Sequence, residues 1–293
     1  MMVSRILRYS FILITPSSSA TQNPEAIHSE LSRLSPIFGA TPVWPTQISE
    51  FLRLRNVQHI ISICLCDYIW QPFFPHDSLP SHQGMDQFLK AVSKSLSTLG
   101  GRSESVWRVL TLRGISALGH SITRSSEVEC TVQRVLDILR PLTTLSESVE
   151  LKEDLVGIIS ESITLWDAAR KDEVKLVVVK QPDSSDKENW RAEDMCGLEV
   201  ALMPPDERID TTGIEPLCLF PVVFQTNSHS ESVVLHQGSA LFPTSHVCIQ
   251  GLLEKNRHEK ELAKAVLEAR SKVNARRISF STGPNSPTEG KVS

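Results

Sequence analysis

The sequence lacks the features that mark most secreted and membrane-spanning proteins. It contains no Asn-x-Ser/Thr sequon, and apart from Cys64 and Cys66 its six cysteines are scattered along the chain. This distribution is unlike the dense disulfide framework of a small secreted domain. No apolar run reaches the about 20 residues that a membrane-spanning helix needs. We therefore expect an intracellular protein, cytoplasmic or nuclear, without a membrane span.

The sequence motifs of the common enzyme classes are also missing. There is no Gly-x-Ser-x-Gly elbow, no glycine-rich phosphate-binding loop, no His-Glu-x-x-His pair and no Cys-x-x-Cys pair. The formal net charge of −4 gives no whole-chain indication of nucleic-acid binding. The sequence therefore predicts no catalytic residue, no cofactor, no metal and no nucleic-acid partner.

Residues 1–24 carry no acidic residue, and Arg5 and Arg8 lie close to a short apolar run, Phe11–Ile14. Basic, apolar and small residues in this order are found in signal peptides, and the missing acids are typical of a mitochondrial presequence. The apolar run is short for a signal peptide. We interpret these residues as a flexible leader, with a cleaved targeting segment as the alternative.

From about residue 25 to residue 170, apolar residues recur at steps of three and four, which predicts consecutive amphipathic helices. No such helix can bury its apolar face alone, so the economical arrangement is an irregular helical bundle. The prediction depends on four stripes: Met85, Phe88, Leu89, Val92 and Leu96; Trp107, Leu110, Leu118 and Ile122; Val128, Val132, Val135 and Leu139; and Leu151, Leu155, Ile159 and Trp166.

The most apolar stretch runs from Val57 to Phe74, and its apolar residues also follow helical steps. His59 and Asp67 oppose membrane insertion. Cys64 and Cys66 would lie about 200° apart on a helix, so they cannot share a metal or form a disulfide without unwinding it. We interpret the stretch as a buried central helix.

Residues after Arg170 have a different character. The β-branched segment 173–180 predicts a strand, and residues 217–225 and 232–242 predict the two strands of a hairpin. Between them, residues 180–215 hold ten Asp and Glu against four Lys and Arg, which is typical of an acidic, partly ordered loop. His246 and Cys248 would share one face of a strand, which permits a metal site, but no spacing indicates the other ligands.

A final helix is predicted from about Ile249 to Asn274. Its residues Leu262, Val266, Ala269 and Val273 form a short seam of the coiled-coil type, which we expect to dock on the body or on one partner helix. The fold class is therefore mainly α, an irregular helical bundle with a small C-terminal β-hairpin element and a terminal helix. The predicted units are a flexible leader (1–24), a helical body (25–179), an acidic loop (180–216), a hairpin plus C-terminal helix packed on the body (217–277) and a disordered tail (278–293).

The tail holds two patterns that protein kinases recognise. Ser279 follows two arginines, and Ser286 precedes a proline. A phosphate adds about −1.5 to −2 charges at pH 7. Beside a basic helix end it would either strengthen local pairing or weaken binding to an acidic partner.

Four segments resemble a group of uncharacterised proteins from filamentous fungi: Asp67–Phe74, Arg134–Leu142, Leu165–Leu176 and Leu217–Phe242. The resemblance covers roughly residues 48–253. It implies that the helical body and the hairpin belong to one recurring unit. It implies no activity and no functional residue.

We therefore expect a non-catalytic interaction or regulatory protein with an unidentified protein partner. The polar residues of the helices are explained by caps and solvated faces, and none forms a recognisable catalytic set. The alternative is an enzyme of unrecognised type, with a pocket between the helical body and the β element. His236, His246 and Asp67 are then the first candidate residues. A convergent pocket of titratable groups would favour the enzyme, and an exposed apolar surface would favour the interaction protein.

Overall fold

The structure is a computed structural model that describes residues 46–73, 80–99, 102–117, 124–140, 145–182, 186–194, 211, 213–226 and 232–281. The predicted leader, most of the acidic loop and Ser286 lie outside these residues. The protein is mainly helical, as predicted. Among the described residues, the helices are α4 (Gln47–Cys64), α5 (Pro80–Thr98), α6 (Ser103–Ala117), α7 (Arg124–Leu139), α8 (Leu145–Ala169) and α9 (His246–Ser281). No helix in this part of the chain is long and apolar enough to cross a membrane.

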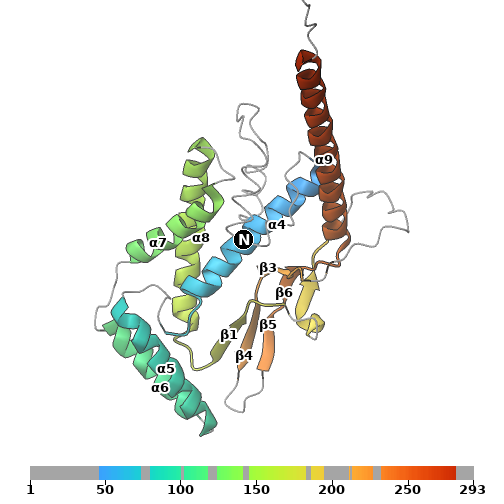
Figure 1. Ribbon diagram of the computed structural model, residues 1–293. Helices are drawn as coiled ribbons and strands as arrows, with labels where there is room; N and C mark the ends of the chain where they lie inside the picture. Colours follow the sequence, from blue (N-terminus) through green and yellow to red (C-terminus); the bar gives the residue numbers. More distant parts are fainter. Residues whose placement is uncertain are drawn as a thin grey trace, which may run out of the picture.

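Helix α4 lies at the centre of the molecule, with α7 and α8 on one side and the strands on the other (Figure 1). Thr46 caps its N-terminus, where the Thr46 side chain accepts a hydrogen bond from the backbone N–H of Ser49 at 3.1 Å. A single π-helical turn, Leu65–Ile69, ends it just before Pro72. The prediction of a buried central helix in this stretch is confirmed, since Val57, Ile61 and Cys64 are all buried.

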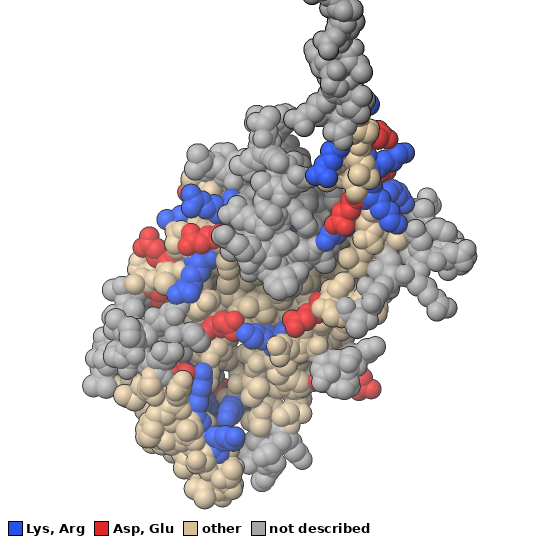
Figure 2. Space-filling model, in the orientation of Figure 1, with Lys and Arg blue, Asp and Glu red and all other residues tan. Residues whose placement is uncertain are grey.

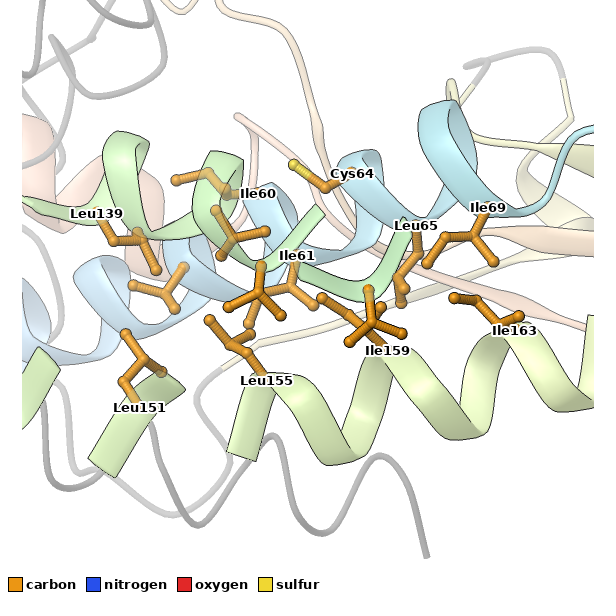
Figure 3. Close-up of a cluster of buried hydrophobic side chains, with 14 of the residues drawn as sticks. Ile60, Ile61, Cys64, Leu65, Ile69, Leu139, Leu151, Leu155, Ile159 and Ile163 are labelled. Carbon is orange, nitrogen blue, oxygen red and sulfur yellow. The ribbon is translucent and has the colours of Figure 1, made fainter. Parts of the chain in front are cut away.

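The main hydrophobic core lies between α4, α7 and α8 (Figure 3). The predicted stripes of α7 and α8 are buried in full, which confirms both. Each helix contributes its apolar face at the expected spacing, so burial of apolar surface accounts for this part of the bundle.

The predicted stripes of α5 and α6 are only partly correct. On α5, Leu89 is buried in a smaller core with Phe73 and Leu112, whereas Phe88 is 62% exposed. On α6, Leu110 is exposed, and the buried face instead includes the charged residue Arg108. Leu118 and Ile122 lie outside the described residues. The apolar pattern gave the wrong face of α6 because part of that helix's buried surface is polar.

The β structure contains the predicted strand within residues 173–180 and is larger than the predicted hairpin. It consists of β1 (Lys175–Val179), β2 (Trp190–Ala192), β3 (Leu217–Phe220), β4 (Val222–Thr226), β5 (Ser232–His236) and β6 (Gly238–Leu241). One sheet has the order β1-β4-β5 and is antiparallel, and the other has the order β2-β6-β3 with β2 parallel to β6. Each predicted hairpin strand is therefore split between two sheets. Pro221, which has no backbone N–H to donate, separates β3 from β4.

Side chains of helix α4 also form hydrogen bonds with backbone carbonyl groups of β3. The ladder between β3 and β6 is irregular between Cys218 and Phe220, so Leu219 has no partner in the register. Its carbonyl oxygen accepts hydrogen bonds from Gln58 Nε2 at 3.3 Å and from Ser62 Oγ at 2.5 Å. His59 Nδ1 lies 3.0 Å from the carbonyl oxygen of Cys218, to which it donates. The polar residues of this apolar helix therefore fix it to the sheet.

Helix α9 differs from its prediction at both ends. It begins at His246, and the Ser245 side chain accepts a hydrogen bond from the backbone N–H of Cys248. It continues to Ser281, so the first four residues of the predicted disordered tail are helical. The first strong helix breakers after the seam are Gly283 and Pro284, which explains why the helix passes Ile278.

Gly238 and Gly157 should respond in opposite directions to replacement by alanine. A Cβ atom at Gly238 would lie 2.6 Å from Trp190 Cε3 and 2.8 Å from Val222 Cγ2, whereas one at Gly157 in α8 would have no neighbour within 4 Å. We expect Gly238→Ala to lower the free energy of unfolding by about 1–3 kcal/mol through overpacking. Gly157→Ala should raise it by about 0.5–1 kcal/mol, because alanine favours the helix. Urea denaturation of the two variants measures both changes. A Gly238→Ala variant more stable than the unchanged chain would contradict the close packing of Gly238 against Trp190 and Val222.

Candidate functional site

The structure does not bring the three candidate catalytic residues together. Asp67 lies in the π-helical turn and pairs with Lys180. His236 ends β5 and packs on the Phe220 ring with a centroid distance of 4.6 Å. His246 is the first residue of α9. Each position has a structural explanation, and no shared contact joins them.

The expectation that His246 and Cys248 share a strand face is wrong. Both lie in the first turn of α9, where residues two apart point in directions about 200° apart. Among the described residues, no group of three or more His, Cys, Asp and Glu side chains could hold a metal ion.

The thiols of Cys64, Cys66 and Cys218 are free and buried. Burial raises the pKa of Cys64 to about 11 and that of Cys218 to about 12. Burial also raises the pKa of Cys66, with a further contribution from Cys218 nearby. Thiols that hold their protons at neutral pH are poor nucleophiles, so these residues act as core packing groups.

A cavity of about 320 Å³ lies where α5, α6 and α8 meet β1. Its wall combines apolar side chains, including Phe73 and Trp166, with serine hydroxyls and five cationic side chains: Lys90, Lys94, Arg108, Arg170 and Lys175. Figure 2 shows Lys and Arg side chains gathered below the centre of the molecule, where the α5–α6 pair faces the β1-β4-β5 sheet. No carboxylate or imidazole is among the described residues that line the cavity.

Arg108 fixes one wall of this cavity. Its side chain is almost fully buried and donates hydrogen bonds to the carbonyl oxygens of Arg170 at 2.8 Å, Asp172 at 3.0 Å and Glu173 at 2.9 Å. These carbonyls follow the end of α8, where a helix leaves its last acceptors without intrahelical donors. The guanidinium group therefore holds α6 against the segment that leads into β1.

A buried carboxylate joins α5, α6 and β1 behind the same wall. Ser93 donates a hydrogen bond of 2.6 Å to Glu104. Arg108 Nε lies 3.5 Å and Lys175 Nζ 3.8 Å from the same carboxylate oxygen. Two cations and one hydroxyl compensate the buried charge, and the network positions Lys175 at the cavity.

Sequence reasoning missed this cavity, although one signal was present. On α5 the residues Lys90, Ser93, Lys94 and Ser97 recur at helical spacing, so they line one face. Such a polar stripe is usually a solvated surface. Here it faces Arg108, Arg170 and Lys175, which come from distant segments.

The second candidate surface is the exposed part of α9. The helix begins in a core in which Val247 packs with Leu52 and Leu219, and Thr46 Oγ1 donates a hydrogen bond of 2.7 Å to Glu254. From residue 259 to residue 272 every side chain is exposed. Figure 1 shows this part of α9 as a rod that leaves the body. The seam residues Leu262 and Val266 are 52% and 45% exposed, so they do not dock on the described body.

Comparisons with known proteins add no family to these observations. No protein-family model matches the chain, no curated protein is significantly similar to it, and no solved structure matches its fold. The resemblance to a fungal group therefore stays an expectation.

Proposed function

We propose that this protein is a non-catalytic interaction or regulatory protein that binds a partner helix along α9. The observation that supports this proposal is the exposed seam. Leu262, Val266 and Ala269 step by four and three, the spacing that places side chains along one line of a coiled coil. All three are exposed on a helix whose first turns are anchored in the body. Burial of such a seam by a second helix would remove apolar surface from water.

The charges beside the seam indicate what kind of helix fits. With Leu262 and Ala269 at position d and Val266 at position a, Arg270 and Arg277 fall at e and Lys272 falls at g. In a parallel pair of identical chains, Lys272 of one would face Arg277 of the other, and like charges disfavour that pairing. The proposed partner is therefore a different protein, with an amphipathic helix that carries Asp or Glu beside its own seam.

Ser279 occupies a g position in the same register, seven residues after Lys272. Its backbone belongs to α9, and two arginines precede it. A phosphate there would place negative charge on the basic flank and weaken binding to an acidic partner helix. Ser279 is therefore the proposed regulatory site. Ser286 remains a predicted second phosphosite.

Affinity purification with matched variants tests the proposal. Leu262→Lys combined with Val266→Lys introduces charges into the seam, whereas Leu267→Lys changes a more exposed apolar residue at position b, outside the seam. We expect the double variant to reduce recovery of the partner by at least about tenfold, as loss of about 1.4 kcal/mol or more requires. The Leu267→Lys variant should recover as much of the partner as the unchanged chain does. Ser279→Glu should reduce recovery to an intermediate level.

Direct binding measurements with the purified partner then test whether it binds through an acidic amphipathic helix. The recovered protein should contain a helix with acidic flanks, and its binding should weaken as salt is raised, because the flanking charges are exposed. Equal recovery of the partner by all variants would contradict the proposal that the partner binds at the seam. Reproducible recovery of no partner, together with a tightly bound small molecule in the native mass spectrum, would favour the enzyme alternative.

The cavity beside Arg108 is the observation that favours that alternative, since it lies at the junction of the helices and the β structure. The residues expected to act there, His236, His246 and Asp67, do not line it. Its described walls offer cations and hydroxyls, which bind ligands, and no evident general base. The interaction function is therefore the better supported proposal.

A further inference from the structure

The cavity between α5, α6, α8 and β1 carries an inference that is independent of the partner helix. Three acidic side chains next to its wall are each paired with a wall cation: Asp86 with Lys90 at 2.7 Å, Glu104 with Arg108 and Lys175, and Asp167 with Arg170. Five cationic side chains line the cavity. Positive charge therefore exceeds negative charge at this site, which favours an anionic ligand.

The two arginines of the wall are largely committed to the protein itself. Arg108 binds three backbone carbonyl oxygens, and Arg170 donates a hydrogen bond of 2.7 Å to the carbonyl oxygen of Phe73 and pairs with Asp167. Each keeps one buried Nε–H without a hydrogen-bond acceptor. The paired N–H groups with which these arginines could bind a ligand carboxylate in a bidentate manner are therefore already hydrogen-bonded within the protein.

The lysines are more available. Lys94 is exposed, and no hydrogen bond or ion pair joins it to the described part of the chain. Lys175 Nζ lies 3.4 Å from Ser93 Oγ and 3.8 Å from Glu104, both longer than a strong charge-assisted hydrogen bond. Lys90 reaches the same cavity from one turn before Lys94. Its ammonium group donates to Gln71 Oε1 at 3.1 Å and pairs with Asp86, so one of its three N–H groups remains for a ligand. Three ammonium groups can thus approach one polyanionic group, whereas the Ser97 hydroxyl already donates its proton to the carbonyl oxygen of Ser93 at 2.8 Å.

Another part of the wall is apolar. Phe73 and Trp166 are buried, and Pro72 and Leu176 complete this surface. Trp166 is held by a hydrogen bond of 2.8 Å from its Nε1 to the carbonyl oxygen of Gln71, so its ring has a fixed position. A ligand that fits both parts has a compact anionic head and an apolar body. The volume of about 320 Å³ is at the small end of ligand pockets.

We propose that this cavity is a binding site for a small phosphate monoester with an apolar or aromatic substituent. Its phosphate would lie among Lys90, Lys94 and Lys175, and its substituent would lie against Trp166 and Phe73. Lysine binds phosphate as a point charge and needs no fork geometry, which matches the groups that remain available. A phosphate monoester carries close to two negative charges at pH 7, so it gains more than a carboxylate from three ammonium groups.

Isothermal titration of the full chain with phenyl phosphate tests this proposal, with inorganic phosphate, benzoate and phenol as comparison ligands at 0.15 M salt. We expect phenyl phosphate to bind one saturable site, inorganic phosphate to compete more weakly, and benzoate and phenol to bind more weakly still. Lys94→Gln should weaken the binding of phenyl phosphate by about tenfold, which is the loss expected for one hydrogen bond to a charged group.

Lys152→Gln is the matched control, because Lys152 is exposed on α8 and does not line the cavity. It should leave the affinity unchanged. Lys94 makes no contact that folding needs, so loss of binding in its variant reports on the site. Equal affinity in both variants would overturn the proposal, as would the absence of saturable binding or benzoate that binds as tightly as phenyl phosphate. None of these results depends on α9, so this proposal and the interaction function fail separately.

Discussion

Replacement of Arg108 by methionine is expected to lower the free energy of unfolding by about 3–5 kcal/mol, the cost of removing one partner from a buried charge pair. Arg108 is 3% exposed, and its guanidinium group donates to three backbone carbonyl oxygens and pairs with Glu104. Methionine fills a similar volume, so the expected loss comes from unsatisfied polar groups and an undercompensated carboxylate.

Two further variants separate this explanation from a general effect of losing an arginine. Arg113 lies on the same helix and is exposed, so Arg113→Met should change the free energy of unfolding by less than about 0.5 kcal/mol. The double variant Arg108→Met with Glu104→Gln should recover part of the loss, because it removes the buried charge that the single variant leaves poorly compensated. Urea denaturation measures all three. Similar destabilisation by Arg108→Met and Arg113→Met would show that Arg108 does not clamp the end of α8.

The same residue shows what apolar periodicity cannot predict. The stripes of α7 and α8 were predicted because their buried faces are mainly apolar. The buried polar residues Thr131 and Ser162 are small, and each donates a hydrogen bond to a carbonyl oxygen of its own helix. Helix α6 buries Glu104 and Arg108, whose partners lie on α5 and beyond the end of α8. A charged residue in a local pattern predicts a solvated face, and only the long-range partner makes its burial favourable.

The β structure was predicted in part for a related reason. Each apolar segment was recognised as strand-forming, and β1 was predicted as a strand near its observed position. The pairing of β1 with β4 and of β2 with β6 joins segments that are far apart in the chain. Local pattern identifies neither partner, so a hairpin was the simplest prediction. The cavity was missed because its wall is assembled by the same long-range contacts, between α5, α6, α8 and β1.

The central core should also respond strongly to a change of one side chain. Leu155 on α8 is fully buried and packs between Leu151 and Ile159, opposite Ile61 of α4 (Figure 3). Leu155→Ala removes buried methyl groups and leaves a cavity that the surrounding helices fill only in part. We expect it to lower the free energy of unfolding by about 2–5 kcal/mol.

Leu165→Ala provides a control with identical chemistry on the same helix. Leu165 is 58% exposed, so its truncation removes little buried surface, and alanine has the higher helix propensity. The change in the free energy of unfolding should stay within about 0.5 kcal/mol. Urea denaturation followed by circular dichroism compares the two variants, and the slope against urea should be the same in both. If Leu155→Ala cost no more than Leu165→Ala, the side chain would not lie at the centre of a close-packed core. The packing of α4 between α7, α8 and the strands, which positions both the cavity and α9, would then be wrong.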